Sequence, residues 1–340
     1  MADVSLEDWQ VRTARADDLP ALVALAQMTG GGFTNLPQDE AALAARLARS
    51  EATLAADDAA ARTGLTMLVL EHRHSGRVGG TAAIFGEVGT DWPFYSYKIT
   101  TIALKSRELG RTFRTRVLHL VNDFDGASEV GGLFLAPDLR AGGLGRLLAR
   151  SRYLFMARHR ARVADRCLAE LRGVIREDGS SPFWDGLAGR FFGMGFVEAD
   201  RFNSLHGNQF IADLMPKYPV YEALLPESAA AVLGVEHPDG RAARRMLEAE
   251  GFRFNAYVDI FDGGPTLDVE TDRIRTVALA RCLEVEAGAP PADARCGLVG
   301  FGRRAGFRGM ALPAETTAGT VRLPAAAGAR AGEEVIHAPF

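Results

Sequence analysis

The sequence predicts an α+β fold, in which a mixed, mostly antiparallel sheet is flanked by helices and followed by a small β-rich C-terminal subdomain. Three observations support this. The apolar patterns of residues 9–163 run in the order strand, two helices, several strands, helix. A glycine-rich turn joins the last of these strands directly to the helix. Beyond about residue 267 the chain breaks into short strand-like runs. We therefore expect two parts, residues 1–266 and 267–340.

The first part begins with a predicted strand at residues 9–13 and a helix that starts at Ala16, with acidic residues in its first turn. A second helix is expected from Asp39 to Ser50. Three consecutive glycines lie between the helices, in TGGGFTNLP at residues 29–37, and each would cost about 1 kcal/mol in a helix relative to alanine. This segment is therefore predicted to be a sharply bent loop.

Alternating apolar patterns predict the strands of the sheet. They cover residues 65–70, 78–85, 97–104, 116–121 and 130–135. Asp125-Gly126 is typical of a hairpin turn, which would lead into the strand at 130–135.

The glycine-rich turn, Arg140-Ala-Gly-Gly-Leu-Gly145, predicts an anion site. Glycines let the backbone approach a ligand, and the first turn of the following helix offers free N–H groups and a partial positive charge to a phosphate. The helix is predicted to bury Leu144, Leu147, Leu148, Leu154 and Phe155, and to leave Arg146, Arg150, Arg152 and Arg158 mostly in solvent.

Two other interpretations of this turn stay open. A dinucleotide-binding fold also uses a glycine turn, but it usually opens with that turn, whereas here well over a hundred residues come first. The other interpretation is a plain helix start that happens to contain glycines.

Composition is that of an ordinary globular enzyme. Hydrophobic residues make up 47% of the 340 and the net charge is −4, which favours neither disorder nor nucleic-acid binding. The three cysteines are far apart, so neither a disulfide framework nor a metal site is expected. No apolar run reaches membrane-spanning length and the N-terminus is acidic, so we expect a cytoplasmic protein without a signal peptide or membrane anchor.

After the central helix, a buried strand is expected at residues 167–173 and a helix from Ser181 through Phe192. A strand is predicted to open at Gly195-Phe196, because the same pattern of helix, Gly-Phe and strand recurs at Phe252. A helical extension is expected around residues 205–250. The β-rich end should have strands at 275–280, 296–301, 320–324 and 333–338.

Several motifs carry a resemblance to known proteins. The spacing R-x-x-G-x-G, filled by Arg140, Gly143 and Gly145, resembles the pyrophosphate-binding signature of the GNAT acyltransferases. Over roughly residues 11–275, TGGGFTNLP, SEVGGLFL, AELRGVI, SPFW, RFFGMGF, DLMPKYPVY, EHP and YVDIFDGGPTL are together similar to the arginine N-succinyltransferase family.

The resemblance implies a GNAT fold that transfers the succinyl group of succinyl-CoA to the α-amine of L-arginine, the first step of arginine catabolism by the succinyltransferase pathway. It implies succinyl-CoA as a co-substrate and no permanently bound cofactor. It further implies a homodimer or a pair with a homologous chain. The implied coenzyme-binding residues are Leu133, Leu135, Arg140, Gly142, Gly143 and Gly145. For Leu133 we expect contact through backbone groups, with the side chain in the core.

The proton donor for the departing thiolate is expected to be a histidine. Many GNAT enzymes use a Tyr at the position that Phe191 occupies here, and phenylalanine cannot donate a proton. His237 matches the histidine that the succinyltransferase family uses as general acid, and an imidazole with a pKa of about 6.5 suits proton transfer near neutral pH. From the residues alone, His237 is also compatible with an exposed loop position.

Three further residues are candidates for the reaction centre. Glu170 is the second predicted catalytic residue, and Glu129 is its alternative; either carboxylate would bind the guanidinium or help to take the amine proton, or simply pair with an arginine. A covalent route through Cys167 is disfavoured, because its apolar neighbours would raise the pKa of the thiol.

Two alternative functions stay open at this stage. One is a succinyltransferase that prefers ornithine or another amino acid. The other is a non-catalytic GNAT subunit that binds acyl-CoA.

Overall fold

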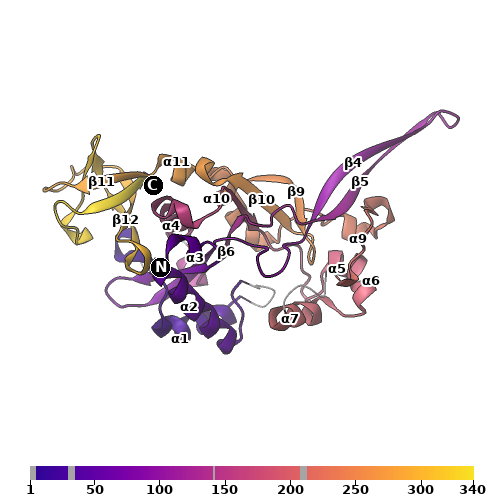
Figure 1. The fold of residues 1–340 in the computed structure, drawn as a ribbon, viewed down its shortest axis with the longest axis horizontal. Helices are drawn as coiled ribbons and strands as arrows, with labels where there is room; N and C mark the ends of the chain where they lie inside the picture. The colour runs from indigo at the N-terminus through magenta and orange to yellow at the C-terminus, as the bar shows by residue number, and fades with distance from the viewer. Residues whose placement is uncertain (1–4, 30–34, 141, 207–212) are drawn as a thin grey trace. The chain divides into compact units, whose positions relative to one another are not determined.

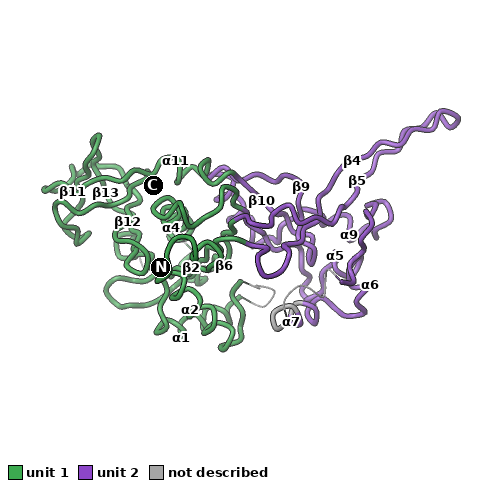
Figure 2. Tube along the Cα trace, in the orientation of Figure 1, with its two compact units in different colours: residues 1–87, 128–167, 270–340 green, residues 88–127, 168–269 purple. Residues whose placement is uncertain are grey.

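A computed structural model describes residues 5–29, 35–140 and 142–206 together with 213–340 (Figure 1). These residues form two compact units, each built from several chain segments (Figure 2). Unit 1 comprises residues 1–87, 128–167 and 270–340, and unit 2 comprises 88–127 and 168–269. The chain changes unit between Val269 and Glu270, close to the expected boundary near 267, which itself stays a prediction.

Unit 1 contains the N-terminal strands, the glycine turn and the C-terminal strands. Its strands are β1 Trp9–Thr13, β2 Leu65–His72, β3 Val78–Phe85, β6 Ser128–Leu135, β11 Arg281–Val285, β12 Cys296–Phe301, β13 Arg308–Pro313, β14 Glu315–Thr316, β15 Thr320–Arg322 and β16 Glu334–Pro339. Its helices are α1 Leu19–Gln27, α2 Glu40–Ala55, α3 Asp58–Ala61, α4 Leu144–Arg158 and α11 Arg275–Leu279. The strand β7, Arg166–Glu170, carries the chain from unit 1 into unit 2.

The strands of unit 1 follow the order β14-β15-β11-β16-β12-β13-β1-β2-β3-β6. Neighbouring strands in this order pair antiparallel except for the parallel pair β11–β15, so the mixed, mostly antiparallel sheet is confirmed. The C-terminal strands are continuous with the first ones, because β13 pairs with β1 with Val11 opposite Gly309. The β-rich end therefore extends the sheet that carries the glycine turn.

The predicted helices of unit 1 are present, although α1 begins at Leu19, after a 3₁₀ turn at Ala16–Asp18. The Asp39 carboxylate caps α2 by accepting a hydrogen bond from the N–H of Ala42 at 2.7 Å, which satisfies one of the free donors of the first turn. Helix α2 packs on β2, and both α1 and α4 contact β3. Leu144 and Leu148 of α4 are fully buried, as expected for its apolar face.

Four arginines of α4 were expected mostly in solvent, and for two of them, Arg152 and Arg158, this prediction is wrong. The side chain of Arg152 is buried, and its guanidinium donates to the carbonyls of Ala149 and Gly131 at 3.2 and 3.4 Å. The side chain of Arg158 is only 4% exposed and forms an ion pair of 2.8 Å with Glu334. Their buried surroundings supply carbonyl or carboxylate partners, so the charges need not face water.

Unit 2 combines a smaller sheet with short helices. Its strands are β4 Ser96–Ser106, β5 Arg111–Val121, β8 Val220–Tyr221, β9 Arg253–Asp259 and β10 Pro265–Glu270, in the order β10-β9-β4-β5-β8. Its helices are α5 Pro182–Gly186, α6 Gly189–Phe192, α7 Phe196–His206, α9 Glu227–Ala230 and α10 Arg241–Ala249. The core includes Tyr97, Leu118, Phe183, Trp184 and Val258.

Three local predictions are wrong. Phe196 begins helix α7, because Phe196 and Ala199 are buried three residues apart, a helical spacing. Residues 275–279 form α11, which packs on α4. Gly126 does turn with φ +79°, but it closes no hairpin, since β5 pairs with β4 and β8 whereas β6 pairs with β3.

Candidate functional site

The central strand β6 is irregular where the coenzyme was expected. Gly131 lies opposite Ala83 and Phe134 opposite Thr81, so two residues of β6, Gly132 and Leu133, face one residue of β3. Gly132 has φ +58°, a conformation that favours glycine. Such a bulge bends the strand and interrupts its ladder, which is consistent with the expected backbone role of Leu133. The side chains of Leu133 and Leu135 are half-buried.

The turn after β6 leads into a helix N-terminus. Gly142 and Gly143 have φ of +65° and +86°, and α4 begins at the next residue; Ala141 lies outside the described residues. The first helical hydrogen bond runs from the N–H of Leu147 to the carbonyl of Gly143 at 3.0 Å. The preceding N–H groups of the first turn therefore have no helical acceptor and point, with the positive end of the helix dipole, toward the turn.

Arg140 and Gly145 lie on either side of this N-terminus. The Arg140 Nε donates to the carbonyl of Leu135 at 3.2 Å, and its exposed guanidinium lies 5.7 Å from the centre of the Phe134 ring. In the part of the chain that the structure describes, a Cβ added at Gly145 would meet only the Leu135 side chain, at 3.8 Å. A basic group and an open glycine surface thus flank free backbone N–H groups, an arrangement suited to phosphate.

Glu129 has a structural role in unit 1 that the sequence did not reveal. Its buried carboxylate accepts a hydrogen bond from the Asn35 side chain at 3.0 Å, and the carbonyl of Asn35 accepts one from Arg46 at 2.9 Å. Burial lowers the pKa of Arg46, and the charge of Glu129 opposes that shift. This network holds one end of the TGGGFTNLP segment against β6; residues 30–34 of that segment lie outside the described residues.

Glu170 and His237 both belong to unit 2. Glu170 ends β7 and accepts a hydrogen bond from the hydroxyl of Thr266 at 3.3 Å. Two residues further along, the carbonyl of Arg172 accepts a hydrogen bond from the N–H of His237 at 2.8 Å. A β-bridge joins Gly173, which follows Arg172, to Glu236, which precedes His237. The loop that carries His237 is therefore fixed to the extension of β7 rather than free in solvent.

The His237 ring has one nitrogen engaged. Its Nδ1 accepts a hydrogen bond from the N–H of Asp239 at 3.3 Å, as the N-cap of a short 3₁₀ turn, and lies 3.6 Å from the Asp239 carboxylate. Burial and the positive charge of Arg172 lower the pKa of His237 from its ordinary 6.5, and Asp239 opposes them. The imidazole is therefore mostly neutral at pH 7, with Nε2 carrying the hydrogen.

A buried pair of carboxyl groups supports the same region, and the sequence analysis missed it. The two oxygens of Asp262 accept hydrogen bonds from the N–H groups of Gly173 and Gly264 at 2.7 and 2.8 Å. The N–H of Asp262 in turn donates to Asp259 at 2.9 Å. Burial and the neighbouring charge of Asp259 raise the pKa of Asp262 to about 8, so the two carboxyl groups share a proton at neutral pH. The turn Asp-Gly-Gly-Pro at 262–265 was the local signal.

The Asp262 proton predicts how stability depends on pH. Between about pH 4 and 8 the folded chain keeps a proton that the unfolded chain has lost, so this contribution to stability falls as pH rises across that window. Asp262→Asn cannot ionise, and we expect its urea midpoint to depend less steeply on pH. At pH 5 the variant should be less stable by about 1–3 kcal/mol, because an amide group replaces one acceptor oxygen. Parallel pH dependences for both chains would contradict the shared proton.

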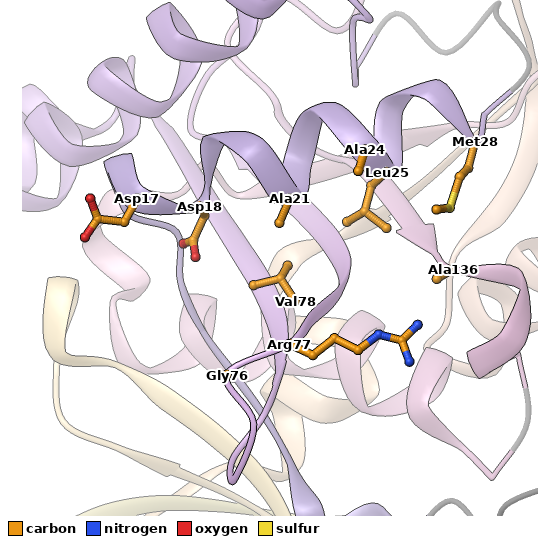
Figure 3. A pocket seen from close by; sticks show the side chains of 10 residues that line it. All are labelled: Asp17, Asp18, Ala21, Ala24, Leu25, Met28, Gly76, Arg77, Val78 and Ala136. Carbon is orange, nitrogen blue, oxygen red and sulfur yellow. The ribbon is translucent and has the colours of Figure 1, made fainter.

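A separate pocket of about 410 Å³ lies between α1 and the turn from β2 to β3 in unit 1 (Figure 3). None of the predicted site residues lines it. Two of its three charged lining residues are already paired, Asp18 with Arg12 at 2.7 Å and Arg77 with Asp138 at 2.7 Å. We therefore assign no function to this pocket.

Two residues considered for chemistry lie in unsuitable places. Phe191 is 53% exposed and cannot donate a proton. Cys167 is fully buried among apolar neighbours, which disfavours the covalent route.

Within the described ranges, no group of His, Cys, Asp or Glu side chains is arranged to hold a metal ion. No helix in the described part of the chain is long and apolar enough to cross a membrane.

The mixed sheet, the bulged strand and the glycine turn at a helix N-terminus are the features of a GNAT-type acyltransferase, and the predicted fold class is confirmed. A family model described as "Arginine N-succinyltransferase beta subunit" matches residues 9–276. The chain belongs to the arginine N-succinyltransferase family.

Individual relatives agree with this assignment. An arginine N-succinyltransferase of Salmonella paratyphi B is 43% identical over 317 residues, 93% of this chain and 92% of the relative, and one of Salmonella arizonae is 44% identical over 284 residues, 83% and 82%. The solved structure of arginine/ornithine succinyltransferase subunit AI from Pseudomonas aeruginosa superposes with a TM-score of 0.86 at 34% identity, covering 97% of this chain and 98% of that one. The prediction of an enzyme of this acyltransferase family is confirmed.

Proposed function

We propose that this chain transfers the succinyl group of succinyl-CoA to the α-amine of L-arginine. The observation that carries the proposal is the match to arginine N-succinyltransferases over nearly the whole chain. The glycine turn of unit 1 supports it, because its free N–H groups and Arg140 suit the pyrophosphate of coenzyme A. The coenzyme is a co-substrate in this scheme, and no permanently bound cofactor is required.

We propose that His237 carries the proton through the reaction. The neutral amine attacks the thioester carbon, so a C–N bond forms and the C–S bond breaks. A neutral imidazole takes the proton that the amine loses, and the imidazolium so formed gives it to the departing thiolate, acting as the expected general acid. The lowered pKa of His237 suits it to begin the cycle neutral. Glu170, at the end of β7, is the proposed partner for the ammonium or guanidinium group of the substrate.

The acceptor is the open part of this proposal. The Pseudomonas aeruginosa relative is titled arginine/ornithine succinyltransferase, so ornithine is the second candidate acceptor. The cytoplasmic location and the expected pairing with a second or homologous chain stay predictions.

The test is release of free coenzyme A thiol from succinyl-CoA with a panel of amino acids. We expect the highest kcat/KM with L-arginine, and none with N-α-acetylarginine, whose amine is blocked. Higher kcat/KM with ornithine would reassign the acceptor. Binding of succinyl-CoA without thiol release for any amino acid would support a non-catalytic subunit instead.

A further inference from the structure

Three segments of unit 2 meet around the loop that carries His237. They are the extension of β7 at residues 171–173, the loop itself at 234–237, and the turn 262–265 that leads into β10. Each pair of segments shares a backbone hydrogen bond, which runs from the N–H of His237 to the carbonyl of Arg172 at 2.8 Å, from Gly234 to Gly263 at 2.8 Å, and from Leu171 to Pro265 at 3.1 Å. We name these three segments the clasp.

The backbones of the clasp approach one another closely at glycines. A Cβ added at Gly173 would lie 2.4 Å from the carbonyl oxygen of Asp262, and one added at Gly264 would lie 2.1 Å from the carbonyl oxygen of Leu171. Real Cβ atoms do not come so close to other atoms, so this approach depends on residues without a side chain. Direct backbone contact therefore fixes the spacing of the β7 extension and the turn.

The Asp262 side chain bridges the clasp from inside. One of its oxygens accepts a hydrogen bond from the N–H of Gly173 at 2.7 Å, and the other accepts one from the N–H of Gly264 at 2.8 Å. Gly173 in turn forms the β-bridge to Glu236, the residue before His237. Because Asp262 is only 8% exposed, an N–H that lost this acceptor would be costly to leave unpaired.

Asp259 completes the inner side of the clasp. Its Oδ1 accepts hydrogen bonds from the N–H groups of Phe261 and Asp262 at 2.7 and 2.9 Å. Burial raises the pKa of both carboxyl groups, and the two are hydrogen-bonded to each other, so the pair carries one shared proton at neutral pH. The pair thus holds the turn and the β7 extension with a single negative charge.

We propose that the clasp, with Asp262 at its centre, positions His237 for proton transfer, which makes Asp262 a positioning residue. The inference rests on the proposed role of His237 in succinyl transfer. Asp262 fixes the β7 extension through Gly173, and the His237 loop is bonded to that extension. A loosened loop keeps the imidazole but holds it less often within reach of the amine and the thiolate. A misplacement of about 1 Å can cost about 10²-fold in rate.

The variant Asp262→Asn tests this role. Asparagine offers one acceptor oxygen in place of two, so the N–H of Gly173 or of Gly264 loses its partner. We expect kcat for free-thiol release to fall by about 10-fold or more at saturating arginine, with the KM for succinyl-CoA unchanged. Asp268→Asn is the matched control, since Asp268 is also 8% exposed in unit 2 but contacts Asn255, at 2.9 Å, outside the clasp. It should keep the wild-type kcat.

The variant Asp259→Asn separates position from charge. It also removes one carboxyl group from the pair, but its amide oxygen can accept the same two N–H groups and an amide hydrogen can take the place of the shared proton. We therefore expect a kcat near that of the wild type. Equal losses in Asp259→Asn and Asp262→Asn would assign the effect to charge and would overturn the positioning role.

NMR of the histidine rings measures the position of His237 without turnover. The chain has seven histidines, and the His237 signal is the one that His237→Asn lacks. Burial and the charge of Arg172 lower the pKa of this ring, so a loosened loop should bring the pKa back toward 6.5 in Asp262→Asn but not in Asp268→Asn. If the wild-type chain releases no thiol with any amino acid, the proposed function fails, and this titration alone still decides whether Asp262 positions His237.

Normal kcat and an unchanged His237 titration in a folded Asp262→Asn chain would overturn the proposal. Circular dichroism verifies folding. If Asp262→Asn does not fold, Gly234→Ala perturbs the clasp from the loop side, because Gly234 has φ +73° and a Cβ there would lie 2.9 Å from the Phe254 ring. We expect the same fall in kcat and the same rise in the pKa of His237. Wild-type values in a folded Gly234→Ala chain would equally exclude positioning by the clasp.

Discussion

Replacing His237 with alanine is expected to lower kcat by about 10²-fold, with little change in the KM for succinyl-CoA. The loss of a general acid or base typically costs 10²–10⁴-fold. The lower end is expected here, because a thiolate is a fairly good leaving group even when it is not protonated first. Free-thiol release at saturating arginine measures the effect. His119→Ala provides a control, since that histidine contacts Thr100 on the β4–β5 hairpin.

The variant His237→Asn separates catalysis from structure. Asparagine is a good N-cap, and its oxygen can accept the Asp239 N–H that the His237 Nδ1 accepts now at 3.3 Å. It cannot carry a proton between amine and thiolate. We therefore expect kcat of His237→Asn to be as low as that of the alanine variant. Recovery of near-normal kcat with asparagine would show that His237 serves only to fix the loop.

The pH profile gives the direction of proton transfer. Because the pKa of His237 is lowered from its ordinary value and the relay starts from neutral imidazole, kcat/KM should show a rising limb at that lowered pKa, separate from the rising limb of the substrate amine. Both variants should lack this limb, while the limb due to the substrate amine should remain. If activity instead falls as the imidazole deprotonates, His237 is protonated at the start of the cycle and acts only as an acid.

The geometry of the glycine turn in unit 1, the proposed coenzyme site, was predictable because its signal is local. A strand, a glycine turn and a helix N-terminus follow one another within residues 128–158, and positive φ at Gly142 and Gly143 is a property that glycine confers on its own position. The bulge at Gly132 was not predicted, since it depends on how β6 pairs with β3. Local chemistry determined the turn, and tertiary pairing determined the strand.

The surroundings of Glu170 and His237 in unit 2 were less predictable because their contacts join distant segments. The Asp262 carboxylate accepts a hydrogen bond from the N–H of Gly173, 89 positions away. The Asp-Gly-Gly-Pro sequence at 262–265 signals a turn but does not identify that partner. Asp125-Gly126 shows the same limit, because the turn forms as expected while its flanking strands pair elsewhere. Arg152 is a third case, since a helical wheel cannot reveal that the Gly131 carbonyl is available to it.

Replacing Gly145 with valine is expected to raise the KM for succinyl-CoA by about 10²-fold and to leave the KM for arginine nearly unchanged. The valine side chain would stand over the first-turn N–H groups and block the pyrophosphate from them. Loss of about two hydrogen bonds to a charged group, at about 1.5 kcal/mol each, the lower end of their usual range, gives an effect of this size. Gly145 is a better test than Gly143, because Gly143 has φ +86° and any side chain there strains the backbone itself.

Gly145→Val should leave the fold intact, since among the described residues a Cβ at Gly145 meets Leu135 alone, at 3.8 Å. Gly319→Val is the matched control: a Cβ at Gly319 has nothing within 4 Å, and that glycine lies between β14 and β15. Both variants should unfold at nearly the same temperature as the wild type, and only Gly145→Val should lose affinity for the coenzyme. An equal rise in both KM values, or normal KM values in a folded Gly145→Val chain, would show that the pyrophosphate binds elsewhere.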